Sequence, residues 1–258
     1  MKRKTIQITT ATLLISIILF AGCEKDKKES APQLPPLSSL AISMDFAEGK
    51  KSTDTYNNIV AAGLAVGYWN TVLYAYLAVP VAAYAEAFNH ECERVDNNTF
   101  LWSYDVEVRD TIYTAELFAD IDGDVINLEM HISQQGGFQD FTWFTGTCDV
   151  LRTSGEWTVF TFPESYAWVS IDWNHDWEAE TFDVRYTNTL ITHEYVDSYI
   201  EYGITEDPAF DAYYIIYDSK EEKNFEIDLN TATHAGRIYY DQTWHCWDVD
   251  YKDISCVE

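Results

Sequence analysis

Carboxylates are the most abundant chemically active side chains in this sequence, and carboxylate pairs are the catalytic groups of glycoside hydrolases. The chain has 258 residues, with 43 Asp and Glu against 16 Lys and Arg. Hydrolysis needs two carboxyl groups held roughly 5 to 10 Å apart. The candidates are Glu164, Asp172 with Asp176, and Glu178 with Glu180. Because acidic residues are so frequent, close pairs also arise without a catalytic role, and an exported glycan hydrolase is therefore an alternative interpretation.

Histidine is the other candidate acid or base, because its pKa lies near neutral pH. The six histidines are scattered, and neither a GxSxG motif nor a protease-like cysteine accompanies them. His175, in the sequence Trp-Asn-His-Asp-Trp, is the first to test. A polar turn residue between two strands is the favoured interpretation of His175. The sequence therefore assigns no catalytic residue and predicts no cofactor.

One short acidic stretch is a candidate metal site. Asp120, Asp122 and Asp124 alternate with Ile121 and Gly123, and clustered carboxylates suit Ca²⁺. The stretch departs from an EF-hand loop, in which glycine is the sixth residue and glutamate the twelfth. Asp-Gly is also typical of tight hairpin turns. We favour the turn and keep calcium as the weaker alternative.

Four cysteines lie in the body of the chain, namely Cys92, Cys148, Cys246 and Cys256. An even number in an exported protein favours disulfides, and four cysteines allow three pairings. We prefer Cys92 with Cys148 and Cys246 with Cys256, because Cys92 closes a predicted helical segment and the last two lie in the final strand and tail. Four free thiols are the alternative. A zinc site is not expected, since no CxxC or HxxxH spacing occurs.

Aromatic residues make up 16% of the chain, with nine Trp and eighteen Tyr. Flat amphipathic rings stack on sugars or line apolar cavities, so they are the best indication of a ligand site. Most of them must fill the core of a wide sheet. The four tryptophans beside polar or turn residues are the ones expected to be partly exposed and to bind a ligand: Trp173, Trp177, Trp244 and Trp247.

The N-terminus has the pattern of a signal peptide, predicted over residues 1–22. Lys2, Arg3 and Lys4 precede an uncharged apolar run that ends at Gly22. Phe20-Ala21-Gly22-Cys23 resembles the lipobox of bacterial lipoproteins. The resemblance covers only these first residues. It implies that the chain is cut before Cys23, that Cys23 carries lipid, and that the protein attaches to the membrane through that anchor.

The segment after the lipobox is predicted to be a flexible tether over residues 23–44. Its mixed charges over 24–29 look like the export signals of surface lipoproteins from Bacteroidota-type bacteria. Both a cell-surface and a periplasm-facing location on the outer membrane stay open. The Pro-rich stretch 30–40 has the composition of an extended spacer. One globular domain is expected over 45–258.

A helical segment is predicted over 54–90, because 55–85 contains no charged residue and is rich in small residues. Thr53 or Asp54 could cap it, and Pro80 marks a kink or the start of a second helix. An apolar circumference implies burial on most sides. The spacing of Gly63 and Gly67 would allow close approach of another backbone. A second membrane span is the rival interpretation of this segment.

From residue 99 to the end, apolar and polar residues alternate with period two. Phe100, Trp102 and Tyr104, for example, alternate with Leu101 and Ser103. About twelve short strands separated by polar turns predict a single wide antiparallel meander. We expect a mainly β protein of the α+β class, curled into an open or closed barrel around the helical segment. The architecture is similar to that of periplasmic lipoprotein carriers, which is a likeness of fold alone.

The charge limits the function classes. A net charge of −27 repels nucleic acid and anionic headgroups, so nucleic-acid binding is excluded. We expect a non-catalytic lipoprotein that binds an apolar or glycan ligand, or an envelope partner. The alternatives are the glycan hydrolase and a purely structural protein whose concavity is filled. An aromatic pocket without close acids indicates binding, whereas two cleft carboxylates indicate hydrolysis.

Overall fold

The computed structural model describes residues 30–41 and 57–256. The predicted signal peptide, the predicted lipobox with Cys23, and the expected caps Thr53 and Asp54 lie outside the described residues. In chain order the structure has one short 3-10 helix, η1 (Leu37–Ser39), one α-helix, α1 (Asn57–Ala87), and then only strands. This confirms the mainly β, α+β class.

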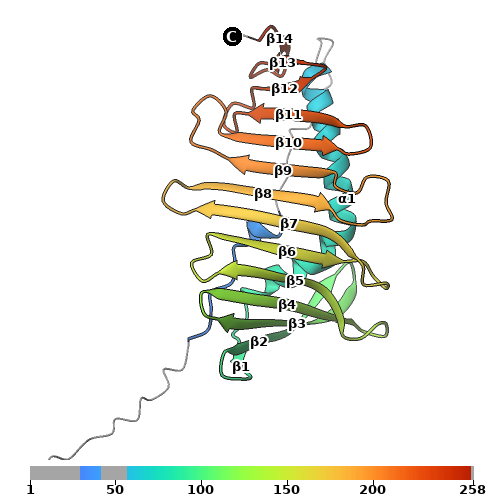
Figure 1. The fold of residues 1–258 in the computed structure, drawn as a ribbon, viewed down its shortest axis with the longest axis vertical. Coiled ribbons are helices and arrows are strands. Elements are labelled where there is room, and N and C mark those ends of the chain that lie inside the picture. Colours follow the sequence, from blue (N-terminus) through green and yellow to red (C-terminus); the bar gives the residue numbers. More distant parts are fainter. Residues whose placement is uncertain (1–29, 42–56, 257–258) are drawn as a thin grey trace, which may run out of the picture.

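All the strands form one antiparallel sheet of fourteen, and each strand pairs with its neighbours in sequence (Figure 1). The sheet is not closed, which agrees with the open form of the predicted meander. The strands are β1 (Glu93–Arg94), β2 (Thr99–Val108), β3 (Thr111–Asp122), β4 (Val125–Gln134), β5 (Phe141–Asp149), β6 (Ser154–Phe160), β7 (Ala167–Asp176), β8 (Thr181–Asn188), β9 (Tyr199–Ile204), β10 (Ala212–Asp218), β11 (Lys223–Leu229), β12 (Gly236–Tyr240), β13 (Thr243–Trp247) and β14 (Asp253–Ile254).

The alternation of side chains gives the sheet an apolar inner face, which we define as the face that carries α1. In β4, Ile126, Leu128, Met130 and Ile132 are buried while the residues between them face outward. Short hairpins join the strands, as between β3 and β4, where Gly123 takes a φ of 63°. Local sequence pattern therefore accounts for the strands and their order.

The helix α1 crosses the strands and joins the two ends of the sheet (Figure 1). It contacts β2 and β3 near its C-terminus and β10 and β12–β14 toward its N-terminus. Asp253 of β14 caps it, accepting hydrogen bonds from the amides of Asn57 and Asn58 at 3.1 and 3.0 Å. Its 31 residues measure about 46 Å, close to the roughly 50 Å of ten strand spacings. A single helix therefore reaches both ends, and Pro80 lies inside it instead of starting a second one.

The expectation that α1 is buried on most sides is wrong. One stripe faces the sheet, and it includes Ile59, Val66, Leu73 and Ala87. Large apolar side chains outside this stripe are exposed, among them Val60, Leu64 and Tyr74. Gly67 meets open space, not another backbone. A lone helix on one sheet has a neighbour on one side only, which is why the stripe is narrow. By length and composition alone, α1 would also suffice to cross a membrane.

The Pro-rich segment 30–41, expected within the flexible tether, is instead part of the globular domain. Leu40 and Ser39 are fully buried, and the segment contacts both α1 and β7. Trp157 Nε1 donates to Ser39 Oγ at 3.2 Å, and the Tyr84 hydroxyl donates to the Pro35 carbonyl at 2.8 Å. Because the prolines interrupt regular structure, carbonyls of this segment stay free to accept bonds from core side chains.

One of the two expected disulfides is present. Cys246 and Cys256 are bonded, with an S–S distance of 2.08 Å. Cys92 and Cys148 are free, so that expected pair is wrong. Cys92 adjoins β1 while Cys148 lies on β5, and β2, β3 and β4 separate them in the sheet. Disulfide-bonded residues need Cα atoms within about 7 Å. Burial raises the pKa of the Cys148 thiol to about 12.

Candidate functional site

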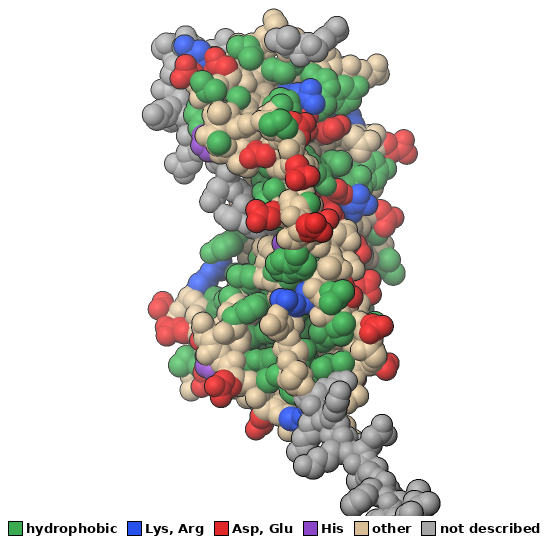
Figure 2. All heavy atoms as spheres, turned by 90° about the vertical axis from the view of Figure 1, so that its left-hand side faces the viewer, with side chains coloured by type: hydrophobic (Ala, Val, Ile, Leu, Met, Phe, Trp, Pro, Cys, Tyr) green, Lys and Arg blue, Asp and Glu red, His purple; other side chains and the backbone are tan. Residues whose placement is uncertain are grey.

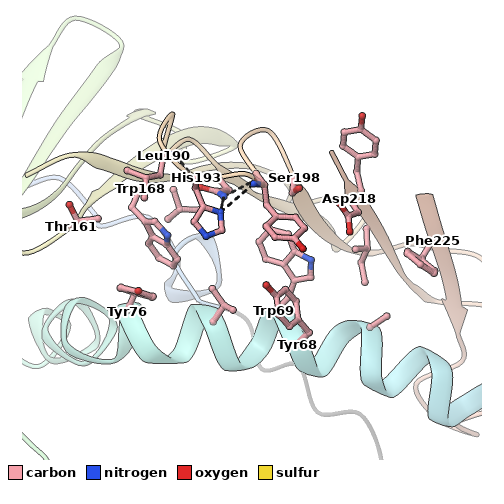
Figure 3. A pocket seen from close by; sticks show the side chains of 17 residues that line it. Tyr68, Trp69, Tyr76, Thr161, Trp168, Leu190, His193, Ser198, Asp218 and Phe225 are labelled. Atoms are coloured by element: carbon pink, nitrogen blue, oxygen red, sulfur yellow. Dashed lines mark hydrogen bonds between the residues drawn. The ribbon is translucent and has the colours of Figure 1, made fainter. Parts of the chain in front are cut away.

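A pocket of about 570 Å³ lies between α1 and the inner face of the sheet (Figure 3). In the close-up, Tyr68, Trp69 and Tyr76 rise from α1 toward Trp168, Leu190 and His193 on the opposite side. Asp218 and Phe225 stand at the other end from Tyr76 and Trp168. The lining is therefore largely aromatic and apolar, with a few polar groups, which is the usual composition of a small-molecule site.

The helix wall of the pocket follows from helical spacing. Ala65, Tyr68, Trp69, Val72 and Tyr76 line the pocket, and residues three or four apart share one face of a helix. Trp69 is almost fully buried, whereas Tyr76 is 53% exposed. The pocket-lining residues of α1 therefore extend from its buried side to its exposed side. The pocket opens where the helix surface turns away from the sheet.

The sheet wall comes from the ends of three strands. Trp168 and Val169 lie at the start of β7, and Ile216 lies near the end of β10. Phe225 of β11 pairs with Ile216 in the sheet register. Trp168 packs on Tyr76 with ring centroids 4.4 Å apart, which closes one end of the pocket. These contacts join α1 to the sheet at a point where their backbones stand apart.

The connection 189–198 between β8 and β9 forms one side of the pocket. Asn188 Nδ2 donates to the Tyr195 carbonyl at 2.9 Å, and Ser198 Oγ lies 2.9 Å from Ser219 Oγ. The Tyr195 amide donates to His193 Nδ1 at 3.3 Å. That nitrogen therefore acts as an acceptor within the loop. Hydrogen bonds within the loop and to Ser219 in the β10–β11 turn thus hold the side of the pocket.

Asp218 is the single carboxylate that lines the pocket, and neither Lys nor Arg lines it within the described residues. Asp218 Oδ1 accepts the amides of Lys220 and Glu221 at 3.0 and 3.1 Å. Oδ2 has no hydrogen-bond partner within the part of the chain that the structure describes. One carboxylate oxygen thus shapes the β10–β11 turn, and the other is available to a ligand.

None of the four tryptophans predicted for ligand binding lines this pocket. Trp173 and Trp247 are buried in the core, with 1% exposure each. Their polar sequence neighbours were misleading, because strand alternation turns both rings inward. Trp173 lies against Gly155, where a Cβ would come within 2.7 Å of the indole, so glycine leaves room for the ring.

The other two tryptophans lie outside the pocket. Trp177 is exposed and donates to the Arg152 carbonyl at 3.1 Å. Arg237 covers the ring of Trp244 at 4.1 Å. Trp69 and Trp168 line the pocket instead. The charge-free stretch 55–85 was the sequence signal for Trp69, whereas nothing local distinguished Trp168.

His175 lies near the end of β7 and does not line the pocket. Its ring stacks on Trp177 with centroids 3.7 Å apart, and its Nδ1 is buried without a hydrogen-bond partner in the described structure. Burial lowers the pKa of His175, and the charge of Arg152 lowers it further, while Asp176 opposes both. His175 is therefore packed as a neutral aromatic ring.

The candidate hydrolytic carboxylates also lie away from the pocket. Asp176 Oδ1 accepts the amides of Glu178 and Ala179 at 2.9 and 3.0 Å, so it shapes the β7–β8 turn. Asp172 lies on the outer face of β7, and Glu164 lies in the exposed β6–β7 connection. None of these residues, nor Glu180, lines the pocket.

The calcium candidates lie on the β3–β4 hairpin. Asp124 lies in the β3–β4 turn, and Asp120 Oδ1 accepts a hydrogen bond from the Thr99 hydroxyl at 2.9 Å. No group of three or more His, Cys, Asp or Glu side chains in the described residues, 30–41 and 57–256, could hold a metal ion. The Asp122-Gly123-Asp124 stretch forms the turn between β3 and β4, as favoured from the sequence.

Two smaller hollows lie elsewhere. One of about 340 Å³ lies between α1 and the β2–β3 connection, where Arg109 covers the ring of Tyr74. The other, of about 460 Å³, is on the outer face of β3–β6 and is lined by Asp120, Glu129 and Glu156 among threonines. The first is lined in part by this pair, and the second is a polar depression in the open sheet surface.

No protein-family model, curated protein or solved structure matches this chain. Its function must therefore be inferred from the geometry of the site.

Proposed function

We propose that this chain is an exported lipoprotein, held at the bacterial envelope by lipid on Cys23, which binds an apolar ligand without transforming it. The observation that carries the binding role is the aromatic pocket of about 570 Å³ between α1 and the sheet. Pockets for small molecules typically measure about 300 to 1,000 Å³ and combine apolar walls with a few polar groups. The volume suits a ligand of moderate size.

The composition of the pocket favours binding over the other two roles. A hydrolase needs two carboxylates beside the substrate, whereas Asp218 is the one carboxylate among the described lining residues. A purely structural protein would have its inner face filled. Here segment 30–41 fills the space near β7, but the space between Trp69 and Trp168 stays open.

Two variants, each replacing an alanine of α1 by phenylalanine, test the pocket. Ala65 lines it, whereas Ala75 is exposed on α1 outside it. Phenylalanine at position 65 would occupy the cavity with little change in stability, because Ala65 is only half buried. Envelope lipids and polysaccharides are first screened by thermal shift, since a ligand that binds the folded state raises the melting temperature.

We expect Ala65→Phe to weaken binding of any hit at least about tenfold and Ala75→Phe to leave it unchanged. Equal binding by the two variants would place the ligand elsewhere. A hit that the protein releases chemically altered would contradict the non-catalytic role.

The lipid anchor rests on the basic start, the apolar run and Cys23 at its end. Cells fed an alkyne-labelled fatty acid should incorporate it into the wild-type protein but not into Cys23→Ala. The variant should also leave the membrane fraction, because acyl chains supply the attachment. Label retained by Cys23→Ala would refute this anchor. Protease treatment of intact cells would distinguish a surface location from a periplasmic one.

A further inference from the structure

We infer that the pocket selects an amphiphilic organic cation, with its apolar body on the aromatic wall and its positive head toward Asp218. This inference rests on the proposed binding function and adds the chemical class of the ligand. The relevant arrangement is visible in Figure 3, where Asp218 stands at one end of the pocket and the rings of Tyr68, Trp69 and Tyr76 follow the helix wall.

Asp218 is the one carboxylate among the described residues that line the pocket, and no Lys or Arg is among them. The Oδ2 of Asp218 is not engaged by any described residue, since the two turn amides both donate to Oδ1. His193 Nδ1 accepts the Tyr195 amide, so this nitrogen offers no N–H to an anionic head. The ammonium of Lys220 is at the rim over the Tyr195 ring, but Glu194 pairs with it at 2.9 Å. An anionic head would therefore face an uncompensated carboxylate, while a cationic head would neutralise it.

The aromatic wall also favours a cation. The face of an aromatic ring carries partial negative charge, so it attracts ammonium and guanidinium groups within about 6 Å. This chain uses that interaction elsewhere, with Arg237 over Trp244 and Arg152 over Trp177. Trp168 and Tyr76 pack on each other, but within the described residues no Lys or Arg covers the rings of Tyr68 or Trp69, which also line the pocket.

The field of the whole molecule acts in the same direction. The chain carries a net charge of −27, and acidic side chains outnumber basic ones along the face shown in Figure 2. A strongly negative surface concentrates cations and accelerates their encounter at low salt. Global steering and the local carboxylate thus favour the same class of ligand.

Three eight-carbon probes that differ in their heads test the inference: octyltrimethylammonium, octan-1-ol and octanoate. Titration calorimetry or tryptophan fluorescence would measure their dissociation constants. We expect the cation to bind at least about tenfold more tightly than octanoate, since a carboxylate and ring faces both discriminate by charge. Salt should weaken binding of the cation to the wild-type protein and leave the alcohol unaffected.

Asp218→Asn removes the charge while keeping an oxygen for the turn, and Asp176→Asn is its matched control. Asp176 makes the same pair of turn hydrogen bonds and carries the same charge, but it does not line the pocket. We expect Asp218→Asn to weaken binding of the cation about fivefold or more and to leave binding of octan-1-ol unchanged. Asp176→Asn should change neither affinity.

The outcomes separate the two proposals. If octan-1-ol and the cation bind equally well, without salt dependence, and Asp218→Asn has no effect, the charge selectivity is wrong while the binding function stands. If no probe binds, or if Ala65→Phe binds all three as tightly as wild type, both fail. Should Asp218→Asn not fold, the salt dependence of the wild-type protein still decides.

Discussion

The inner face of the sheet has two regions that differ in what covers them. Near β6–β8, segment 30–41 lies between the sheet and α1, and Leu40 is completely buried there. From the start of β7 toward β10 and β11, no described segment fills the space, and the pocket remains. Trp157 and Trp168 illustrate the contrast. Trp157 Nε1 donates a hydrogen bond to Ser39, whereas Trp168 faces the pocket and packs on the half-exposed Tyr76.

The comparison teaches that the sheet and the helix alone do not decide between core and binding site. Both regions present large aromatic rings from the same sheet and from the same helix. The filled region gains its packing from a short Pro-rich segment that is remote in sequence from the strands it covers. A ligand in the open region would occupy a position equivalent to that of this segment.

The largest expected difference concerns two leucines. Leu40→Ala should cost about 2 to 5 kcal/mol of unfolding free energy, because the residue is fully buried and its removal leaves a cavity. Leu190→Ala, in the loop that lines the pocket, should cost less than about 1 kcal/mol. Urea unfolding of both variants would measure this, and similar losses would show that the regions are equally packed.

Two tyrosines should show a smaller contrast. Tyr84→Phe removes the hydrogen bond to the Pro35 carbonyl, and we expect a loss of about 1 to 2 kcal/mol because a buried acceptor is left unpaired. The hydroxyl of Tyr76 has no hydrogen bond among the described residues, so Tyr76→Phe should change stability by less than about 0.5 kcal/mol. Thermal and urea unfolding would compare them. A neutral Tyr84→Phe would mean that segment 30–41 is not held in place by this bond.

The smallest effect appears at alkaline pH. Burial raises the pKa of Tyr84 well above its ordinary value. The folded state then holds the proton longer than the unfolded state, so this stabilisation is complete below pH 10 and declines as the pH rises. From an unfolded pKa of about 10, the decline is about 0.8 kcal/mol by pH 10.5.

Tyr84→Phe lacks this titration, which makes it the control. The difference in stability between wild type and Tyr84→Phe should therefore shrink by that amount between pH 7 and pH 10.5. Urea titrations at the two pH values would measure it. A constant difference would contradict burial of the hydroxyl under segment 30–41.

Much of the fold follows from the sequence. The period-two alternation after residue 99 predicts the meander, because strand alternation is local and each tight turn pairs a strand with the next one. The charge-free stretch predicts α1, and an even number of cysteines together with their positions predicts the bond between Cys246 and Cys256. These features depend on residues that are near one another in the chain.

The site depends on contacts between distant residues, and the tertiary structure alone decided it. Polar neighbours suggested that Trp173 and Trp247 are exposed, but their strand phase turns them inward. Three prolines suggested a tether over 30–40, but the space between α1 and the sheet accommodates that segment. Trp69 and Trp168 line one pocket because α1 packs on the two ends of the sheet and stands away from its middle. How much of that gap is filled is a property of three-dimensional packing, which local periodicity does not encode.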